Sequence, residues 1–504
     1  MESSLTDSSF IVKMFRALPQ YASGSKVLLF LYKIFSFLAS ALKGCWLGRL
    51  LTKAGDIKLD RDNSVFYRIT DNVVKSVLYA CRKIYSFAQS GIVYKTAVFF
   101  FKESVFFKVE NMLPLIIFVM FLCPHEMWNN AYALLFAIML LFMYLVAVLR
   151  KRNFGTSVTR IPLTVILFMV SALVSVAISH TRSDSVRVFM FFVTSFMFFV
   201  ITLAVSNTQK RFDKISFALY AAVFASALVA FYQKARGIEV DPSLTDATLN
   251  AGMPGRAFST LANPNNYAQF LIIFMPFCAA FALTRESKWH KAALTCLLVI
   301  PFVALLITYS RSGWLGFMVA TLVFISLYNK KFLPILLAIA ICIIPFLPES
   351  IMNRILTIGN MKDSSNHYRI CIWTGVLLMM RDFWFTGTGL GPEAFRRLYM
   401  IYTSEYARPA PHTHMLFMEV FAEMGVLGVI VFFALIVSLI FVSCRQVNKF
   451  ERKSIPRMYV IAAASSVAGI LMIGFAEYVW FYPRVMFAFF IALGLAASAQ
   501  RIKE

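Results

Sequence analysis

Charged residues are scarce in this sequence. Asp, Glu, Lys and Arg make up only 15% of its 504 residues, whereas 60% are hydrophobic and 16% are aromatic. Soluble domains carry about 25% charged residues, so the composition excludes an ordinary soluble globular protein. Apolar runs of roughly 17–25 residues, the length that crosses a bilayer, recur from about Met112 onward. We therefore predict an all-α polytopic membrane protein.

The sequence also lacks the motifs of several enzyme classes. Its eight cysteines are scattered without C-x-x-C spacing, which implies neither a disulfide framework nor a zinc site. No G-x-S-x-G segment indicates a serine hydrolase. His412 and His414 would share one face of an extended strand, but no third ligand stands at a metal-binding spacing. We expect neither a metal nor another cofactor.

The apolar runs predict about twelve transmembrane helices. Their approximate ranges are Met112–Cys123, Ala131–Leu149, Ile161–Ser179, Val188–Val205, Ile215–Tyr232, Tyr267–Leu283, Ala292–Thr308, Trp314–Tyr328, Phe332–Leu347, His414–Val442, Met458–Phe475 and Val485–Ala499. Short loops with clusters of Lys and Arg separate many of them. The net charge of +24 therefore indicates contact with anionic lipid on the inner side of a membrane, and not binding to nucleic acid.

Basic clusters mark every second loop when the N-terminus is placed inside, as the positive-inside rule requires. This alternation predicts which connections face outward. They are the Gln233–Asn266 loop, the Ser310–Gly313 turn and the long Pro348–Thr413 connection, which ends at the two histidines. Any chemistry that these polar segments carry is therefore predicted to face the outer side.

The first 110 residues differ from the rest of the chain. Lysine and arginine interrupt their apolar and aromatic stretches, Lys26–Leu51 and Val73–Phe101, and the region holds 16 Lys and Arg against 8 Asp and Glu. Basic amphipathic helices of this kind lie in the membrane interface. We predict a cytoplasmic, interfacial extension over residues 1–110 and a membrane domain over 111–504, with one large outer loop at 348–413.

A polar loop meets an apolar segment at His412 and His414. If the helix begins at His414, a step of 100° per residue places Gly425 and Gly428 near its side of the helix and Glu423 nearly opposite. A titratable imidazole would then stand above a small-residue face that packs closely on a neighbour. A histidine at a membrane interface is the simpler alternative at this point.

Three outer-side arginines oppose the orientation signal, so they need another explanation. Arg256, Arg311 and Arg369 lie in or beside apolar or glycine-rich segments. Arginine at membrane depth is costly, and its forked donors suit phosphate. Three such arginines on one side favour a pyrophosphate clamp, although each alone could contact a lipid headgroup.

Two further outer segments have structural explanations. Gly387–Gly391 lacks the Lys and Ser/Thr of a phosphate-binding loop and is more typical of a tight turn. Asn263 is expected to cap the following helix. The nearby Asn265 side chain could also bind sugar hydroxyls.

Four loose motifs in this order resemble the O-antigen ligase and polymerase superfamily of bacterial envelope glycan assembly, over about Leu113–Ala499. The motifs are Arg256-x-Phe-Ser-x-x-x-Asn263-Pro264-Asn265; Ser310-Arg311-Ser312-Gly313; Tyr368-Arg369-x-x-x-Trp373 followed by Gly387-x-Gly389-x-Gly391-x-x-x-Phe395; and His412-x-His414-x-x-Phe417-x-x-x-x-x-Glu423-x-Gly425-x-x-Gly428. The chain departs from the family pattern at Met415, where Asn, Ser or Gln is usual, and at Met418, where Leu is usual.

The resemblance implies a metal-independent glycosyltransferase with a GT-C-like fold in the bacterial plasma membrane. Its donor would be an undecaprenyl-pyrophosphate-linked oligosaccharide, its acceptor a glycan hydroxyl, and its partners other polysaccharide-assembly proteins. His414, Arg256 and Arg311 correspond to the family's essential residues, and we expect them to be catalytic in an inverting transfer. A set of four residues is assigned to substrate binding: Arg369, His412, Asn265 and Glu423. Because Met415 removes a usual polar neighbour, the partner of His414 stays open.

Two other function classes remain open at this point. A transporter or flippase of lipid-linked glycan would also carry polar groups, but such proteins place them near the bilayer midplane, often in repeats. A scaffold subunit would tolerate loss of the outer arginines. The concentration of polar groups on one side favours the enzyme.

Overall fold

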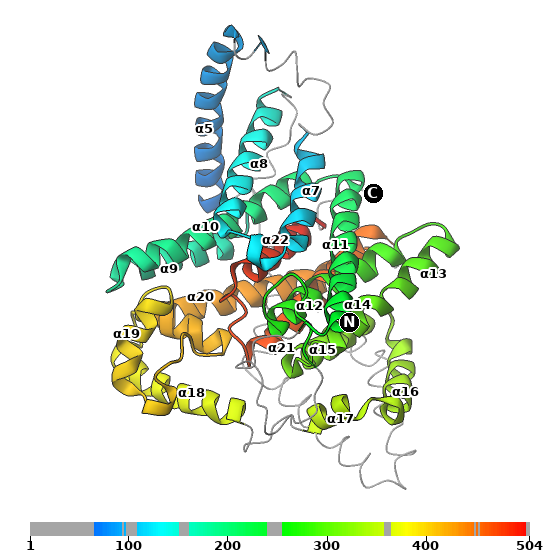
Figure 1. Cartoon of the computed structure of the whole chain (residues 1–504). Coiled ribbons are helices and arrows are strands. Elements are labelled where there is room, and N and C mark those ends of the chain that lie inside the picture. Colours follow the sequence, from blue (N-terminus) through cyan, green and yellow to red (C-terminus); the bar gives the residue numbers. More distant parts are fainter. Residues whose placement is uncertain are drawn as a thin grey trace, which may run out of the picture. The chain divides into compact units, whose positions relative to one another are not determined.

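The computed structural model describes residues 65–92, 95–96, 108–150, 161–238, 255–356, 364–447, 450–451 and 454–499. All regular elements in these ranges are helical (Figure 1). The α-helices are α5 (Val65–Gln89), α7 (Val109–Leu122), α8 (Asn130–Arg150), α9 (Leu163–Ile178), α10 (Arg182–Val205), α11 (Gln209–Arg236), α12 (Pro264–Leu283), α13 (Lys288–Leu297), α14 (Val299–Leu306), α15 (Arg311–Asn329), α16 (Leu333–Ile343), α17 (Glu349–Leu356), α18 (Ser364–Phe383), α19 (Pro392–Tyr402), α20 (Leu416–Val447), α21 (Ile455–Gly474) and α22 (Pro483–Ala499).

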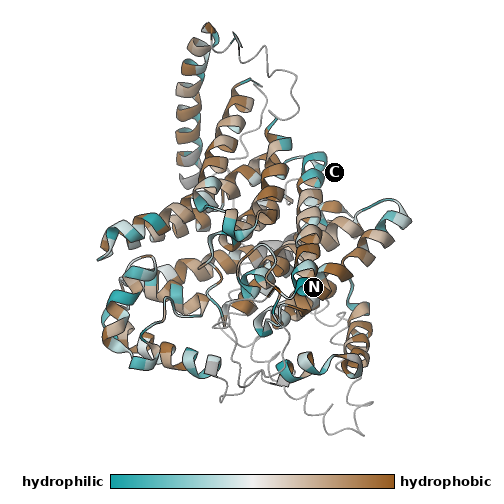
Figure 2. Ribbon diagram, viewed as in Figure 1, coloured by the Kyte–Doolittle hydropathy of each residue, from teal (hydrophilic) through white to brown (hydrophobic). Residues whose placement is uncertain are grey.

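The predicted class, an all-α polytopic membrane protein, is confirmed. Each of the twelve predicted apolar segments is helical in the structure, the seventh as the pair α13 and α14. Within the described residues, eight stretches have the length and composition to cross a membrane, and three shorter apolar helices accompany them. Figure 2 shows that apolar residues dominate these helices, whereas the polar residues gather at their ends and in the connections.

Helix boundaries differ from the prediction where polar residues continue a helix. The fifth apolar segment, predicted as Ile215–Tyr232, lies within α11, which runs from Gln209 to Arg236. It ends at Gly237, whose φ of +65° is the left-handed conformation that stops a helix and favours glycine. The apolar run thus indicates the part of a helix that can lie in the bilayer, not its full length.

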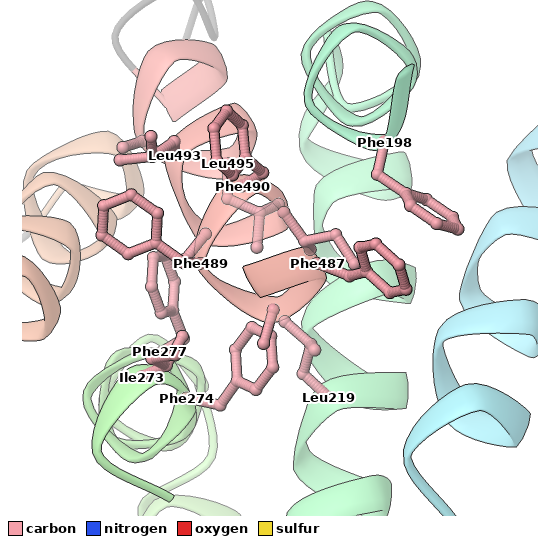
Figure 3. Close-up of a cluster of buried hydrophobic side chains, with 14 of the residues drawn as sticks. Phe198, Leu219, Ile273, Phe274, Phe277, Phe487, Phe489, Phe490, Leu493 and Leu495 are labelled. Atoms are coloured by element: carbon pink, nitrogen blue, oxygen red, sulfur yellow. The ribbon is translucent and has the colours of Figure 1, made fainter. Parts of the chain in front are cut away.

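Helices α12, α21 and α22 form the most buried part of the membrane domain. α21 packs against both α12 and α15, and α22 packs against α10. Figure 3 shows the aromatic and aliphatic side chains that fill this region, including Phe198, Leu219, Ile273, Phe274, Phe277, Phe487, Phe489, Phe490, Leu493 and Leu495. These helices provide the rigid frame from which the polar connections extend.

Small residues bring α15 and α21 into close contact. A Cβ atom at Gly316 would lie 2.9 Å from the carbonyl oxygen of Gly469 and 2.7 Å from Ile473 Cγ1. Lipid tails are as apolar as the side chains, so helices in a bilayer gain stability mainly from such tight packing. The contact fixes the start of α15, and therefore Arg311, relative to the end of α21.

The long Pro348–Thr413 connection is largely helical over its described residues. It contains α17, α18, α19 and a short 3-10 turn at Glu405–Ala407. α18 and α19 pack against each other around buried side chains that include Ile372, Met379, Phe395 and Tyr399. This second core holds Arg369, on α18, in a defined position.

The prediction that a helix begins at His414 was wrong. Helix α20 begins at Leu416, and His414 adopts a left-handed φ of +53° before it. The helix is also interrupted at Gly425, which has φ 64° and ψ −167°. His414, Gly425 and Gly428 therefore do not lie along one continuous helical face.

The glycine-rich segment after α18 fills the interruption in α20. The backbone N–H groups of Thr388 and Gly389 donate to the carbonyl oxygens of Ala422 and Glu423, over 2.8 and 3.2 Å. In the other direction, Val426 N–H donates to the Trp384 carbonyl oxygen over 2.8 Å. Buried backbone groups require partners, so each segment satisfies groups that the other leaves free. Gly387–Gly391 is thus a tight turn, as predicted.

Helix α5 is the described part of the predicted interfacial region. Large apolar side chains at Ile69, Val73, Val77, Ile84 and Phe87 are exposed along one side. At 100° per residue, Lys75 and Arg82 project from the other side of the helix. Most of residues 1–110 lies outside the described ranges, so the interfacial role and the boundary near residue 110 stay predictions. The chain divides into two compact units between Arg68 and Ile69.

Candidate functional site

Arg256 lies in the connection that leads into α12. The helix starts as predicted, with Asn263 as its cap accepting from Asn265 N–H and Pro264 in the first turn. Only 4% of Arg256 is exposed, and its guanidinium donates to the Thr308 carbonyl oxygen over 2.9 Å and to Asn265 Oδ1 over 2.8 Å. The cap of α12 therefore positions Asn265, which in turn orients Arg256.

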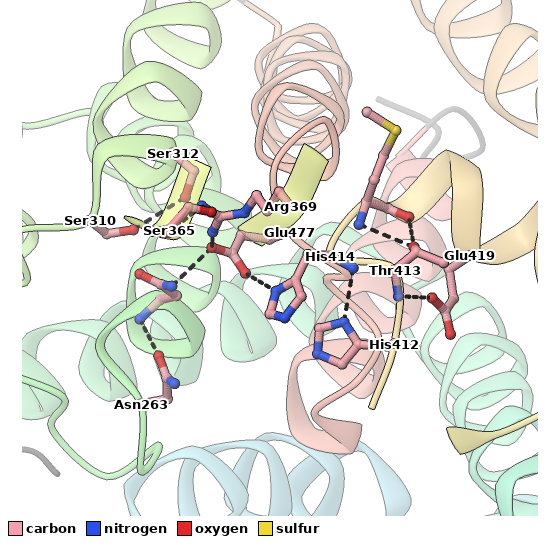
Figure 4. Close-up of polar contacts among 12 residues, drawn as sticks. Asn263, Ser310, Ser312, Ser365, Arg369, His412, Thr413, His414, Glu419 and Glu477 are labelled. Carbon is pink, nitrogen blue, oxygen red and sulfur yellow. Dashed lines mark hydrogen bonds and ion pairs between the residues drawn. The ribbon is translucent and has the colours of Figure 1, made fainter. Parts of the chain in front are cut away.

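Glu477, in the turn between α21 and α22, connects several of the predicted site residues (Figure 4). Its Oε1 accepts hydrogen bonds from Asn265 Nδ2 over 3.0 Å and from Arg369 Nη2 over 2.8 Å. Its Oε2 lies 4.0 Å from Nδ1 of His414. One buried carboxylate thus brings together groups from α12, from α18 and from the turn that precedes α20.

The charges in this cluster shift the pKa values of both Glu477 and Arg256. Burial alone would raise the pKa of Glu477, but Arg369, His414 and Arg256 outweigh it and hold that pKa below its usual value. Burial and the neighbouring guanidinium groups of Arg354, Arg311 and Arg369 lower the pKa of Arg256 to about 9, and Glu477 opposes this shift. At neutral pH the carboxylate is therefore ionised and Arg256 remains a cation.

The two histidines form a compact pair. The backbone N–H of His414 donates to Nδ1 of His412 over 3.1 Å, and the ring centroids lie 4.1 Å apart. Burial, together with the nearby His414 and Arg369, lowers the pKa of His412 well below its usual value. His412 is therefore neutral, with its proton on Nε2, and its Nδ1 acceptor stabilises the unusual backbone conformation of His414.

Other contacts hold the same turn. Thr413 N–H donates to Glu419 Oε2 over 2.6 Å, and Trp373 Nε1 donates to the Thr413 carbonyl oxygen over 3.0 Å. The His414 side chain remains 24% exposed. Its ring can therefore meet a ligand while its backbone is fixed from several sides.

The pH dependence of stability follows from the buried position of His412. An unfolded histidine binds a proton below about pH 6.5, whereas folded His412 resists protonation to a lower pH. The unfolded state then holds more protons, so stability falls as pH falls through this window, by up to about 1.4 kcal/mol per pH unit.

His412→Asn keeps an acceptor for the His414 N–H but does not titrate. We expect the thermal unfolding midpoint of this variant to change less between pH 7 and 5 than that of the wild type. His290→Asn, at an exposed site, is the control and should keep the wild-type pH dependence. Equal slopes in all three proteins would contradict the assignment.

Arg311 is the first residue of α15, directly after the Ser310 cap, whose hydroxyl accepts from Gly313 N–H. It is half-buried, and its charge acts on Arg256. The structure thus brings Arg256, Arg369, Asn265 and His414 together around Glu477, with Arg311 close enough to influence the cluster electrostatically.

Sequence reasoning missed two residues of this neighbourhood. Arg354 of α17 is buried and donates through Nε to the Tyr309 carbonyl oxygen over 3.4 Å, and after burial its charge is the largest influence on the pKa of Arg256. The sequence pattern that could have indicated Arg354 is its position three residues after Ile351, on the apolar side of a short helix. The signal for Glu477 was a lone carboxylate in a short, otherwise apolar connection.

Glu423, predicted to bind substrate, connects three segments of the chain in the structure. It is buried, and its carboxylate accepts from Gly391 N–H over 2.8 Å and from the Tyr478 hydroxyl over 3.4 Å. The carboxylate thus ties the glycine-rich segment to α20 and to the turn that carries Glu477. Its predicted contact with substrate stays a prediction.

The described residues contain no group of three or more His, Cys, Asp and Glu side chains placed to hold a metal ion. The site is instead made of guanidinium groups, one carboxylate and two imidazoles. Such a set can bind an anionic group and move a proton.

These features define a polytopic membrane protein with a buried arginine, glutamate and histidine cluster beside its transmembrane helices. Residues 296–433 match the family model described as O-antigen ligase, which confirms the predicted resemblance over that part of the chain. The matched segment contains Arg311, Arg354, Arg369 and His414. No curated protein matches the chain. This match associates the protein with glycosyl transfer in envelope polysaccharide assembly.

Proposed function

We propose that the protein transfers a glycan from an undecaprenyl-pyrophosphate-linked oligosaccharide to a hydroxyl of an acceptor glycan, as a polysaccharide polymerase or ligase. The observation that carries this proposal is the contact of Glu477 with Arg369, Asn265 and His414. This contact places the guanidinium of Arg369, which is suited to binding a pyrophosphate, beside the imidazole of His414, which is suited to activating a hydroxyl. The match to the O-antigen ligase model supports the same reaction class.

The arginines supply the electrostatic part of the reaction. Arg256 is held rigidly in the cluster, and Nε of Arg369 is buried without a hydrogen-bond partner among the described residues. A pyrophosphate oxygen would satisfy this donor. Negative charge develops on the pyrophosphate as it leaves, and preorganised guanidinium groups stabilise that charge without a metal.

His414 supplies the acid–base part. Its Nδ1 is directed at Glu477, so Nε2 is the nitrogen that faces the acceptor hydroxyl. The acceptor oxygen forms a bond to the anomeric carbon, its proton passes to His414, and the bond to the pyrophosphate oxygen breaks with its electron pair leaving on undecaprenyl pyrophosphate. Attack opposite the leaving group inverts the anomeric centre. Glu477 thus serves as the polar partner of His414, in place of the Asn, Ser or Gln that is usual at the position of Met415.

Location follows from the sequence and the position of the site. The predicted outer connections contain Arg256, Arg311 and Arg369 and end at the two histidines, and Glu477 contacts Arg369 and His414. The proposed reaction therefore faces the extracytoplasmic side of the plasma membrane. A donor that has already crossed the membrane would reach the arginines from the lipid side.

Reconstitution tests this function. Purified protein in liposomes with a lipid-linked oligosaccharide is expected to form a longer or acceptor-linked glycan in the presence of a chelator. Arg256→Lys retains the charge but loses the fork that contacts both Thr308 and Asn265, and we expect product formation to fall by about 10- to 100-fold. Arg397→Lys, on α19, is the control and is expected to leave the rate unchanged. Translocation of the lipid-linked glycan without any covalent product would overturn the enzyme and favour a flippase.

A further inference from the structure

A row of aromatic rings passes through the histidine pair. The Phe481 ring lies against His412, with centroids 4.3 Å apart, and His412 lies against His414. On the other side, Tyr368 meets His414 edge to face, with centroids 6.1 Å apart. The candidate base is therefore not isolated in a polar cavity, because aromatic side chains flank it in both directions.

The two ends of this row are exposed. Tyr368 meets Tyr406 at a centroid distance of 5.6 Å and an interplanar angle of 88°, and Tyr406 is 53% exposed. At the other end, Phe481 is 47% exposed. We call the five residues Tyr406, Tyr368, His414, His412 and Phe481 the aromatic row. Exposed rings at both ends and a partly exposed imidazole between them make a surface that an elongated ligand can cover.

The surroundings of Tyr406 favour a sugar over an acyl chain as the ligand of the aromatic row. The exposed ion pair of Arg408 with Glu405, 3.4 Å apart, stands beside Tyr406, and the exposed His367 ring lies 5.8 Å from the Tyr406 ring. Charged groups at a lipid-facing surface are costly. A pyranose has one apolar face of C–H groups and a rim of hydroxyls, so it can stack on a ring while polar neighbours bind its edge.

The position of the row relative to Glu477 indicates which substrate it holds. Figure 4 shows the His414 ring between the Glu477 carboxylate and the His412 ring. Glu477 and Arg369 lie on the side proposed for the donor pyrophosphate, so the rings that flank His414 in both directions are left for the acceptor. We propose that the aromatic row is the acceptor-glycan subsite, in which sugar rings stack on Tyr406 and Phe481 and present a hydroxyl to His414. This inference rests on the proposed glycosyl transfer.

Steady-state kinetics of the full chain in liposomes test the subsite. Tyr406→Ala and Phe481→Ala should each raise the KM for the acceptor about tenfold or more, with the donor KM within about threefold of wild type. Tyr406→Trp and Phe481→Trp retain a stacking ring and should restore the acceptor KM. Tyr132→Ala removes a tyrosine that is 47% exposed on α8 and serves as the matched control. A rise in the donor KM alone, or an unchanged acceptor KM in both alanine variants, would overturn the proposal.

A binding measurement separates this inference from the reaction itself. The probe is an oligosaccharide released by mild acid from the polysaccharide of the cells that make the protein. Saturation-transfer NMR with the purified chain should show its ring protons close to the protein, and the signal should weaken several-fold in Tyr406→Ala. If no protein transfers glycan but this difference in signal persists, the proposed reaction fails while glycan binding on the aromatic row stands. If transfer occurs and the signal is the same in all variants, the subsite is wrong.

Discussion

Glu477→Gln is expected to lower the turnover number for glycosyl transfer by about 100- to 1,000-fold, which lies within the contribution typical of general acid–base catalysis. The substitution keeps the size of the side chain but removes the charge that pairs with Arg369 at 2.8 Å and faces His414 at 4.0 Å. The amide would also place donors where Asn265 and Arg369 already donate. Rates with saturating donor and acceptor measure this effect.

The same substitution distinguishes a catalytic arrangement from a merely structural one. If Glu477 acts by orienting His414, the double variant with His414→Ala should be little slower than the slower single variant, because groups that act as one unit are not additive. Glu393→Gln provides the control, since Glu393 pairs with Arg396 at 3.7 Å on the exposed surface of α19. A turnover number within threefold of wild type for Glu477→Gln would contradict its role, and strictly multiplicative losses would show that it acts apart from His414.

Most of the membrane domain was predictable because bilayer insertion depends on local composition. Each apolar run from Met112 onward forms a helix, and the arginines that oppose the orientation signal, Arg256 and Arg369, do lie in one buried cluster. These inferences needed only run length and the position of charges. The side of the membrane that the cluster faces stays a prediction.

The partners of the site residues were not predictable, because they depend on contacts between distant segments. Glu477 lies 63 positions after His414 in the numbering, and no periodic pattern connects them. The backbone of His414 was mispredicted because a positive φ is uncommon at a non-glycine residue and leaves no sequence signal. Here it is held by His412 and by the Thr413 contacts, which only the folded chain brings together.

The Gly425–Gly428 spacing was a correct observation, but the continuous helical face inferred from it was wrong. Gly425, by its spacing from Gly428, indicated a small-residue face on a helix, a common reason for glycine in membrane helices. In the structure it is glycine because the chain leaves the helix there, with φ 64° and ψ −167°, a region that essentially only glycine adopts. The carbonyl oxygens of Ala422 and Glu423 at this interruption accept the Thr388 and Gly389 N–H groups, which anchors the segment between α18 and α19 to α20.

Gly425→Ala is therefore expected to destabilise the protein by about 3–5 kcal/mol, from backbone strain together with overpacking. A Cβ atom would lie 2.2 Å from the Phe385 carbonyl oxygen, which is backbone and cannot move aside as a side chain would. Gly237→Ala is the matched control, because its φ of +65° is similar but no atom lies within 4 Å of the added Cβ. That variant should lose only about 1 kcal/mol. Thermal unfolding midpoints in detergent and the yield of monodisperse protein measure both effects. Equal behaviour of the two variants would show that the contact of the Gly387–Gly391 turn with α20 does not hold α18 and α19 in place.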